Sequence, residues 1–161
     1  MANSCEFNMK ATGKKKDIER LYNMLNYDES EKYYFSRIFD CFYPYEDSFL
    51  NAKDNEKTSA FIYGCCAHSL KSSMLRDDCG DDGCLISIDR ASKLLNLKIE
   101  VVSEEPGLNF TEYYVVDNGK ILVSECNDLI TDEEFEKYKD DEEGLNDLYY
   151  ARSEEIINKL Y

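Results

Sequence analysis

Residues 5–25 read CEFNMKATGKKKDIERLYNML, and the hydrophobic period of this stretch changes once, at Gly13. Before the glycine, apolar residues alternate with polar ones, which is the pattern of a half-buried strand. After it, apolar residues recur at helical spacing and charged residues take the other side. The stretch therefore predicts a strand that runs directly into an amphipathic helix. The strand positions are Cys5, Phe7, Met9 and Ala11, and the helix positions are Ile18, Leu21, Tyr22 and Leu25.

A similar order recurs downstream. Residues 88–95 have the helical period, with Ser87 as a candidate N-cap, and residues 97–103 then alternate between apolar and polar. Two further extended segments, 110–116 and 120–124, flank Asn118-Gly119, and Asn-Gly is a strong signal for a two-residue hairpin turn. A second helix is thus expected to lead into a strand and a β-hairpin.

The other segments have weaker patterns. Residues 59–69 are rich in small and apolar side chains and predict a buried strand, while 31–47 fits a helix or an extended segment equally well. Turn-forming residues predict a loop over 76–84. Thr131 to Glu134 form a capping box that opens a short helix, and residues 145–160 predict a final helix with an apolar inner face around Tyr149 and Ile156.

This order of elements predicts an α+β fold with a ferredoxin-like (split βαβ), antiparallel or mixed sheet and helices on one face. The core is expected to span residues 1–130, and residues 131–161 are expected to form acidic C-terminal helices packed on the same domain. The side chains predicted to be buried are Phe7, Met9, Ile18, Leu21, Leu25, Leu94, Ile99, Val101, Tyr114 and Ile121.

Two segments resemble the YubB ferredoxin-like family of plasmid and phage proteins. The chain opens Met1-x-Asn3-x-Cys5, and a later segment, Glu105-Pro106-Gly107-x-x-Phe110, precedes the hairpin; both motifs are typical of that family. The resemblance covers residues 1–26 and 85–123. It implies a ferredoxin-like fold and an origin in a mobile element, and it implies no chemistry.

Charge is distributed unevenly along the chain. The net charge is −15, and residues 103–161 hold 17 acidic against 5 basic side chains. Such a field repels nucleic acid and membrane surfaces and attracts basic partners. No apolar run is long enough to span a bilayer, and the first residues lack the pattern of a secretory signal. We therefore expect a cytoplasmic protein that binds neither nucleic acid nor membranes directly.

No pattern of residues identifies a catalytic or metal site. His68 is the only histidine and could act with Cys65 or Cys66, and the same residues could hold zinc together with Cys79 and Cys84. The spacing of the cysteines is wider than the usual zinc-binding motif, and an odd number of cysteines at irregular spacing indicates reduced thiols. The pair Glu104-Glu105 is expected to be solvated, as carboxylates at a turn usually are. We expect no enzyme, no metal and no cofactor.

The charge and the resemblance together suggest a function. We expect a non-enzymatic acidic binding protein of a mobile element that inhibits a host nucleic-acid-handling defence protein, as anti-CRISPR proteins do, by occupying its basic nucleic-acid site. A cryptic Cys/His metal protein or enzyme and a self-assembling structural protein, such as a homodimer, are the alternatives. The residues expected to bind the partner are Glu133, Glu134, Glu136, Asp140, Asp141, Glu142 and Glu143.

Overall fold

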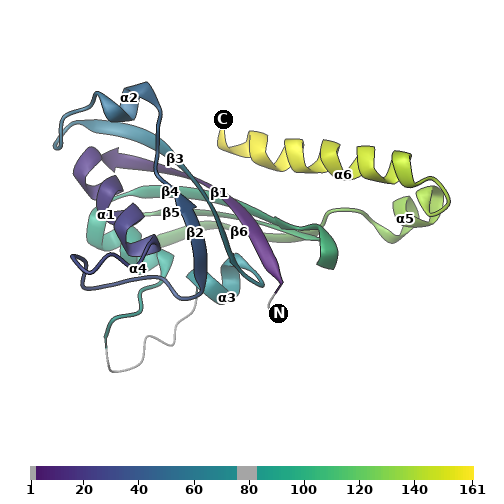
Figure 1. The fold of residues 1–161 in the computed structure, drawn as a ribbon, viewed down its shortest axis with the longest axis horizontal. Coiled ribbons are helices and arrows are strands. Elements are labelled where there is room, and N and C mark those ends of the chain that lie inside the picture. The colour runs from purple at the N-terminus through teal and green to yellow at the C-terminus, as the bar shows by residue number, and fades with distance from the viewer. Residues whose placement is uncertain (1–2, 76–82) are drawn as a thin grey trace.

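One six-stranded sheet organises the protein (Figure 1). The structure is a computed structural model, and it describes residues 3–75 and 83–161. The strands lie in the order β2-β3-β1-β4-β5-β6, and every neighbouring pair is antiparallel. Their bounds are β1 Ser4–Lys14, β2 Ile38–Phe42, β3 Lys57–Ala67, β4 Lys98–Glu105, β5 Phe110–Asp117 and β6 Lys120–Asp128. The expected α+β class is confirmed.

Helices connect and cover the strands. Strand β1 runs directly into α1, as the change of period at Gly13 predicted. The segment whose type the pattern left open, 31–47, contains β2, and α2 begins at its last residue. The helices are α1 Lys15–Leu25, α2 Asp47–Leu50, α3 Leu70–Met74, α4 Ile88–Leu95, α5 Asp132–Tyr138 and α6 Glu142–Ile157, with 3-10 turns η1 Pro106–Leu108 and η2 Asn158–Leu160. The predicted loop at 76–84 lies mostly outside the described residues.

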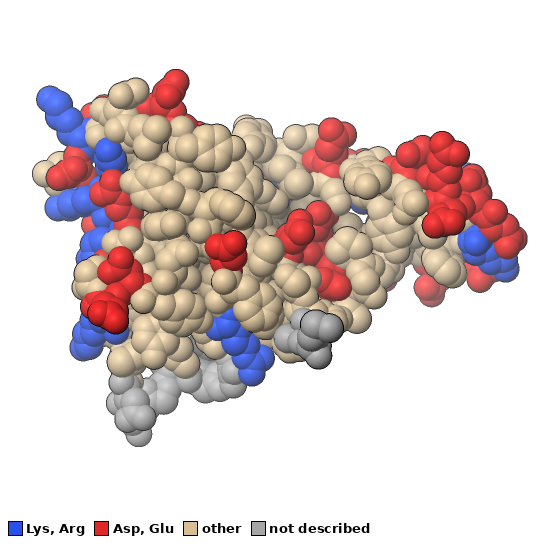
Figure 2. All heavy atoms as spheres, viewed as in Figure 1, with Lys and Arg blue, Asp and Glu red and all other residues tan. Residues whose placement is uncertain are grey.

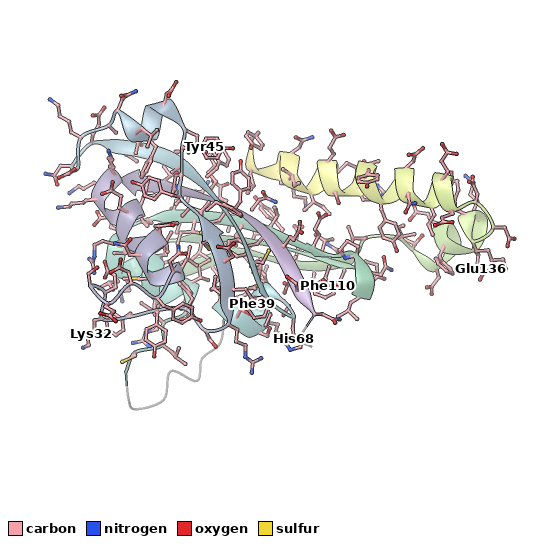
Figure 3. All side chains as sticks on the ribbon, viewed as in Figure 1. Lys32, Phe39, Tyr45, His68, Phe110 and Glu136 are labelled. Atoms are coloured by element: carbon pink, nitrogen blue, oxygen red, sulfur yellow. The ribbon has the colours of Figure 1, made fainter. Side chains whose placement is uncertain are left out.

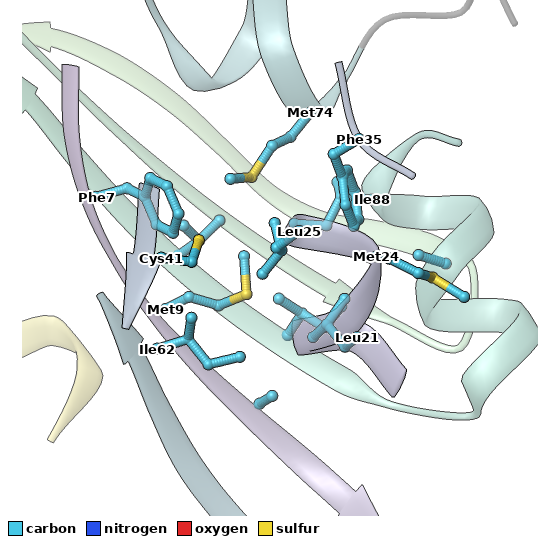
Figure 4. Close-up of a cluster of buried hydrophobic side chains, with 14 of the residues drawn as sticks. Phe7, Met9, Leu21, Met24, Leu25, Phe35, Cys41, Ile62, Met74 and Ile88 are labelled. Carbon is cyan, nitrogen blue, oxygen red and sulfur yellow. The ribbon is translucent and has the colours of Figure 1, made fainter. Parts of the chain in front are cut away.

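The core lies between one face of the sheet and helices α1, α3 and α4. Alternate residues of β1 are buried against Leu21 and Leu25 of α1, with Phe35 and Ile88 closing the cluster (Figure 4). Helix α1 packs on both β1 and α4, which is the arrangement that the sequence pattern predicted. Eight of the ten predicted core residues are buried: Phe7, Met9, Ile18, Leu21, Leu25, Ile99, Val101 and Tyr114.

The other two predicted core residues are wrong. Leu94 is 48% exposed and Ile121 is 49% exposed. On α4 the buried side chains are Ile88, Ala91 and Leu95, and Leu94 lies about 120° around the helix from the line through Ile88 and Leu95. Ile121 lies on β6, an edge strand of the sheet in which every residue but Val123 is exposed. The sequence pattern predicted the types of α4 and β6 but not which of their side chains are covered by other elements.

The hairpin turn is confirmed. Strands β5 and β6 pair Asp117 with Lys120, so only Asn118 and Gly119 form the turn. Both have positive φ, 45° and 85°, as a type I′ turn requires. The sheet consequently ends in a tight turn next to α4.

Candidate partner-binding surface

Helices α5 and α6 form a hairpin that extends beyond the end of the sheet (Figure 1). The predicted capping box opens α5: the Thr131 hydroxyl accepts the Glu134 amide, and the Glu134 carboxylate accepts the Thr131 amide. Asp141 then caps α6 by accepting the amide of Gly144 at 3.0 Å. Both helices thus begin at an acidic or hydroxyl cap, which favours a sharp turn between them.

The two helices are joined by an ion pair. Arg152 of α6 donates to Glu134 of α5 at 2.9 Å and to Glu155 at 2.9 Å. The Thr131 amide, followed by the Arg152 guanidinium, holds the pKa of Glu134 below its usual value. Glu134 therefore helps to hold the hairpin together.

The base of the hairpin is fixed to the sheet before α5 begins. Asn109 has positive φ, and its side chain accepts from the Ile130 amide at 2.9 Å and donates to the Ile130 carbonyl at 2.7 Å. Leu129 and Ile130 are both buried. This double contact sets the point at which the chain leaves the sheet.

The far end of α6 is fixed to the sheet face opposite α1. Lys10 of β1 donates to the Leu160 carbonyl at 2.9 Å, and the Tyr161 ring stacks on Phe61 of β3 with centroids 4.7 Å apart. Lys159 pairs with Glu125 of β6 at 2.9 Å. The hairpin is therefore anchored on both sides. Helix α5 and the turn into α6, residues 131–143, project from the sheet and are called the tip below.

Carboxylates gather at this tip, as Figure 2 shows at the right of the view. Residues 131–143 hold eight acidic and two lysine side chains, a net charge of −6. Among the seven predicted partner-binding residues, Glu134 is half-buried and the other six are exposed. Figure 3 places Glu136 on α5 in this part of the hairpin. The predicted residues thus lie together at one end of the molecule.

These carboxylates differ in their local contacts. Glu134 and Asp141 hold caps, and Glu136 pairs with Lys139 at 2.7 Å. Within the part of the chain that the structure describes, no salt bridge or side-chain hydrogen bond engages the other four, Glu133, Asp140, Glu142 and Glu143. These four are the carboxylates that a partner could use without loss of internal contacts.

Two exposed aromatic side chains accompany the charges. Phe135 is 49% exposed on α5, and Tyr150 is 75% exposed on α6. Aromatic residues supply much of the binding energy at protein interfaces. Neither residue was identified as a site residue from the sequence, because a short amphipathic helix and a binding helix share the same spacing.

The candidate zinc and catalytic residues that the structure describes are not brought together in one site. Cys65 and Cys66 are neighbours on β3, so their side chains point to opposite faces. His68 is exposed beyond the end of that strand (Figure 3), and Cys79 lies outside the described residues. No group of three or more possible metal ligands occurs among residues 3–75 and 83–161.

Three thiols of the core have a shifted pKa, and a hydrogen bond with Cys66 lowers the pKa of the Cys5 thiol. A hydrogen bond with Cys5, together with burial, raises the pKa of the Cys66 thiol, and burial raises the pKa of Cys41 to about 12. A thiol of high pKa remains protonated near neutral pH and is a poor nucleophile and metal ligand. Cys41 and Cys66 are therefore poor candidates for a cysteine-based reaction, and the Cys5 thiol is fully buried.

The expectation for Glu104-Glu105 is wrong. Glu105 is only 8% exposed, and Glu104 accepts a hydrogen bond from Ser153 of α6. Because the two residues are consecutive on β4, their carboxylates face opposite sides of the sheet and do not form a pair. Glu104 instead helps to hold α6 on the sheet.

One buried carboxylate was not identified from the sequence. Glu112 of β5 is 2% exposed and accepts from the Leu70 amide at 2.7 Å, the Lys71 amide at 3.3 Å, Ser103 at 3.1 Å and the Tyr114 hydroxyl at 3.1 Å. These donors satisfy the charge, so the residue holds the start of α3 against the sheet. Its donors come from four separate positions, which explains why local patterns gave no signal.

Comparison with protein families, characterised proteins and solved structures finds no match for this chain. The described residues include no helix with the length and apolar composition needed to cross a membrane.

Proposed function

We propose that the protein is a non-enzymatic acidic binding protein whose α5–α6 hairpin docks on the basic nucleic-acid site of another protein. One observation carries the proposal: Glu133, Asp140, Glu142 and Glu143 are exposed on the anchored hairpin, and no side-chain hydrogen bond or salt bridge engages any of the four among the described residues. A groove lined by Lys and Arg is the surface that such a tip would fit.

Fixed geometry adds to the argument. An acidic segment that had to order on binding would lose conformational entropy, whereas a hairpin held by the Glu134–Arg152 pair and by the Leu160 and Tyr161 contacts is already ordered. Phe135 and Tyr150 offer apolar contact area beside the charges. Charge would then give fast association, and the aromatic side chains would slow dissociation.

The proposed partner is a host nucleic-acid-handling defence protein such as a CRISPR effector, and inhibition would come from competition with nucleic acid. A ferredoxin-like core and an origin in a mobile element belong to the same proposal. The order β1-α1-β2-β3-α4-β4 along the chain, with β2-β3-β1-β4 adjacent in the sheet, supports a split βαβ core to which β5 and β6 add. A cytoplasmic location fits this role.

The self-assembly alternative receives less support. Both edge strands are irregular: β2 has a register shift between Ile38 and Asp40, and the pairing of β6 shifts opposite Val115 and Val116. Bulges at sheet edges discourage pairing between copies of a protein.

The test uses guide-loaded effector nucleases and a labelled target DNA. Binding of DNA is measured by fluorescence anisotropy with increasing protein, from low salt to about 1 M, where the Debye length falls to about 3 Å. The parent should displace DNA at low salt. The quadruple variant E133Q/D140N/E142Q/E143Q should associate with the effector at least about tenfold more slowly than the parent and should therefore displace less DNA.

A matched control separates the tip from net charge. The variant E29Q/D40N/D47N/D54N changes the charge by the same amount at exposed positions away from the hairpin. It should inhibit as well as the parent does. Equal inhibition by the parent and the tip variant across the salt range would show that the acidic tip does not bind the partner, and absence of displacement from the effectors would count against this partner class.

A further inference from the structure

A basic pocket lies at the end of the sheet away from the α5–α6 hairpin. Its volume is about 360 Å³, and it lies where β1 ends, β3 and β4 begin and β5 ends. Figure 2 shows lysine and arginine side chains gathered toward this end of the molecule, on the left of the view. The side chains that matter for the argument are Lys14, Lys57, Lys98, Asn55, Asn96 and Asp117.

Two of these lysines face each other without an acidic partner. Lys14 and Lys57 are directly opposite in the register of β1 and β3, where like charges destabilise a sheet. Both are exposed, and neither forms a salt bridge within residues 3–75 and 83–161. The arrangement leaves a local excess of positive charge in an acidic protein.

The third lysine points to the same side of the sheet. Lys98 is opposite Thr12 in the register of β1 and β4, and Thr12 is two residues from Lys14, so the three side chains share one face. Glu100 holds the Lys98 ammonium at 3.1 Å. All three lysines therefore line one pocket.

Two amides and one carboxylate complete the lining. Asn96 ends α4 with a left-handed backbone, and Asn55 lies in the turn before β3; the side-chain amides of both are without a hydrogen bond among the residues that the structure describes. Asp117 is the one acidic side chain of the lining and is opposite Lys98. The three lysines and Asp117 give the lining a net charge of +2, and Lys14 and Lys57 are the two lysines that no salt bridge engages among the described residues.

We propose that this pocket binds a small anion of the diphosphate or triphosphate class and that it holds the phosphate groups of that anion. The volume lies within the range of small-molecule sites, about 300–1,000 Å³. Lysine ammonium groups and amide donors suit phosphate oxygens, and two uncompensated positive charges match a polyanion better than a monocarboxylate. Because the field of the whole protein repels anions, only a site with several convergent donors would hold one.

This inference is independent of the proposed function. The pocket and the acidic tip involve different residues at different ends of the sheet, so the tip variant should retain anion binding. A variant that loses the pocket should likewise retain inhibition.

The probes are inorganic pyrophosphate, ATP and adenosine, titrated into the full chain at low ionic strength by isothermal calorimetry. We expect one saturable site for pyrophosphate and for ATP, and no binding of adenosine. Loss of an ammonium that bonds a phosphate oxygen weakens binding by about tenfold or more. The double variant K14Q/K57Q should therefore lose about a hundredfold in affinity or become unmeasurable.

The control variant K32Q/K71Q removes two exposed lysines elsewhere and should bind as the parent does. Folding is checked by thermal unfolding: K14Q/K57Q removes a repulsive pair, so its melting temperature should equal or exceed that of the parent, while pyrophosphate should raise only the parent and control values.

Three results would overturn the proposal: no saturable binding of pyrophosphate or ATP, equal weakening in K32Q/K71Q, or binding of adenosine as strong as that of ATP. The protein could also self-associate in a salt-dependent way that requires Lys14 and Lys57 and bind no anion. That result would show that the pocket binds the acidic tip of a second copy instead.

Discussion

Leu21 and Leu94 test how burial divides two residues that sequence periodicity treats alike. Both are helical leucines at apolar positions of an amphipathic pattern. Leu21 is fully buried against the sheet beside Met9 and Ile62 (Figure 4), whereas Leu94 is 48% exposed on α4. The same substitution, leucine to alanine, should therefore have unequal effects.

The magnitudes follow from the buried surface. Complete burial of a leucine side chain is worth about 1.5–3 kcal/mol, and the cavity left by Leu21→Ala raises its cost to about 2–5 kcal/mol. Leu94 already has about half of its side chain in water, so Leu94→Ala should cost less than about 1 kcal/mol. Alanine also has the higher helix propensity, which reduces that cost further.

Urea unfolding followed by circular dichroism measures both values. For a urea m value of about 2 kcal/mol/M, a loss of 3 kcal/mol lowers the midpoint by about 1.5 M. The m values of the two variants should match that of the parent, so that midpoints compare stability alone. If Leu94→Ala destabilised the protein as much as Leu21→Ala does, the assignment of the buried face of α4 would be refuted.

Two further predictions concern the β5–β6 turn and the α5–α6 hairpin. Gly119→Ala should destabilise the protein by about 1–2 kcal/mol in the same urea assay, because φ at this position is +85° and an added Cβ would approach Lys93 Cβ to 2.9 Å. Asn118→Gly should be nearly neutral. Equal effects of the two substitutions would contradict the turn geometry. The folded pKa of Glu134 lies below its ordinary value of about 4.3, so the stability that this carboxylate adds over Glu134→Gln should be complete above that pH and should disappear as the pH falls through the folded pKa. Urea midpoints of the two proteins between about pH 2 and 7 measure this, and a difference that grew on acidification would contradict the ion pair with Arg152.

Local patterns could predict most elements of the fold. Alternation over residues 5–11, helical spacing over 18–25, the Asn118-Gly119 turn and the Thr131 capping box all depend on neighbours within a few residues, and the structure has each of them. The acidity of residues 131–143 could also be read directly, because a run of carboxylates needs no tertiary contact to be recognised. These features are local in sequence, and so is the chemistry that produces them.

The remaining features depend on which elements meet. The exposure of Leu94 and Ile121 depends on what covers α4 and β6, and the burial of Glu112 depends on donors from α3, β4 and β5. The convergence of Lys14, Lys57 and Lys98 requires the register of three strands. The sequence by itself determined the types of most elements and the charge of the C-terminal third. Only the tertiary structure decided that Glu134 pairs with Arg152 and that Glu125 pairs with Lys159, because these contacts join residues far apart in the chain.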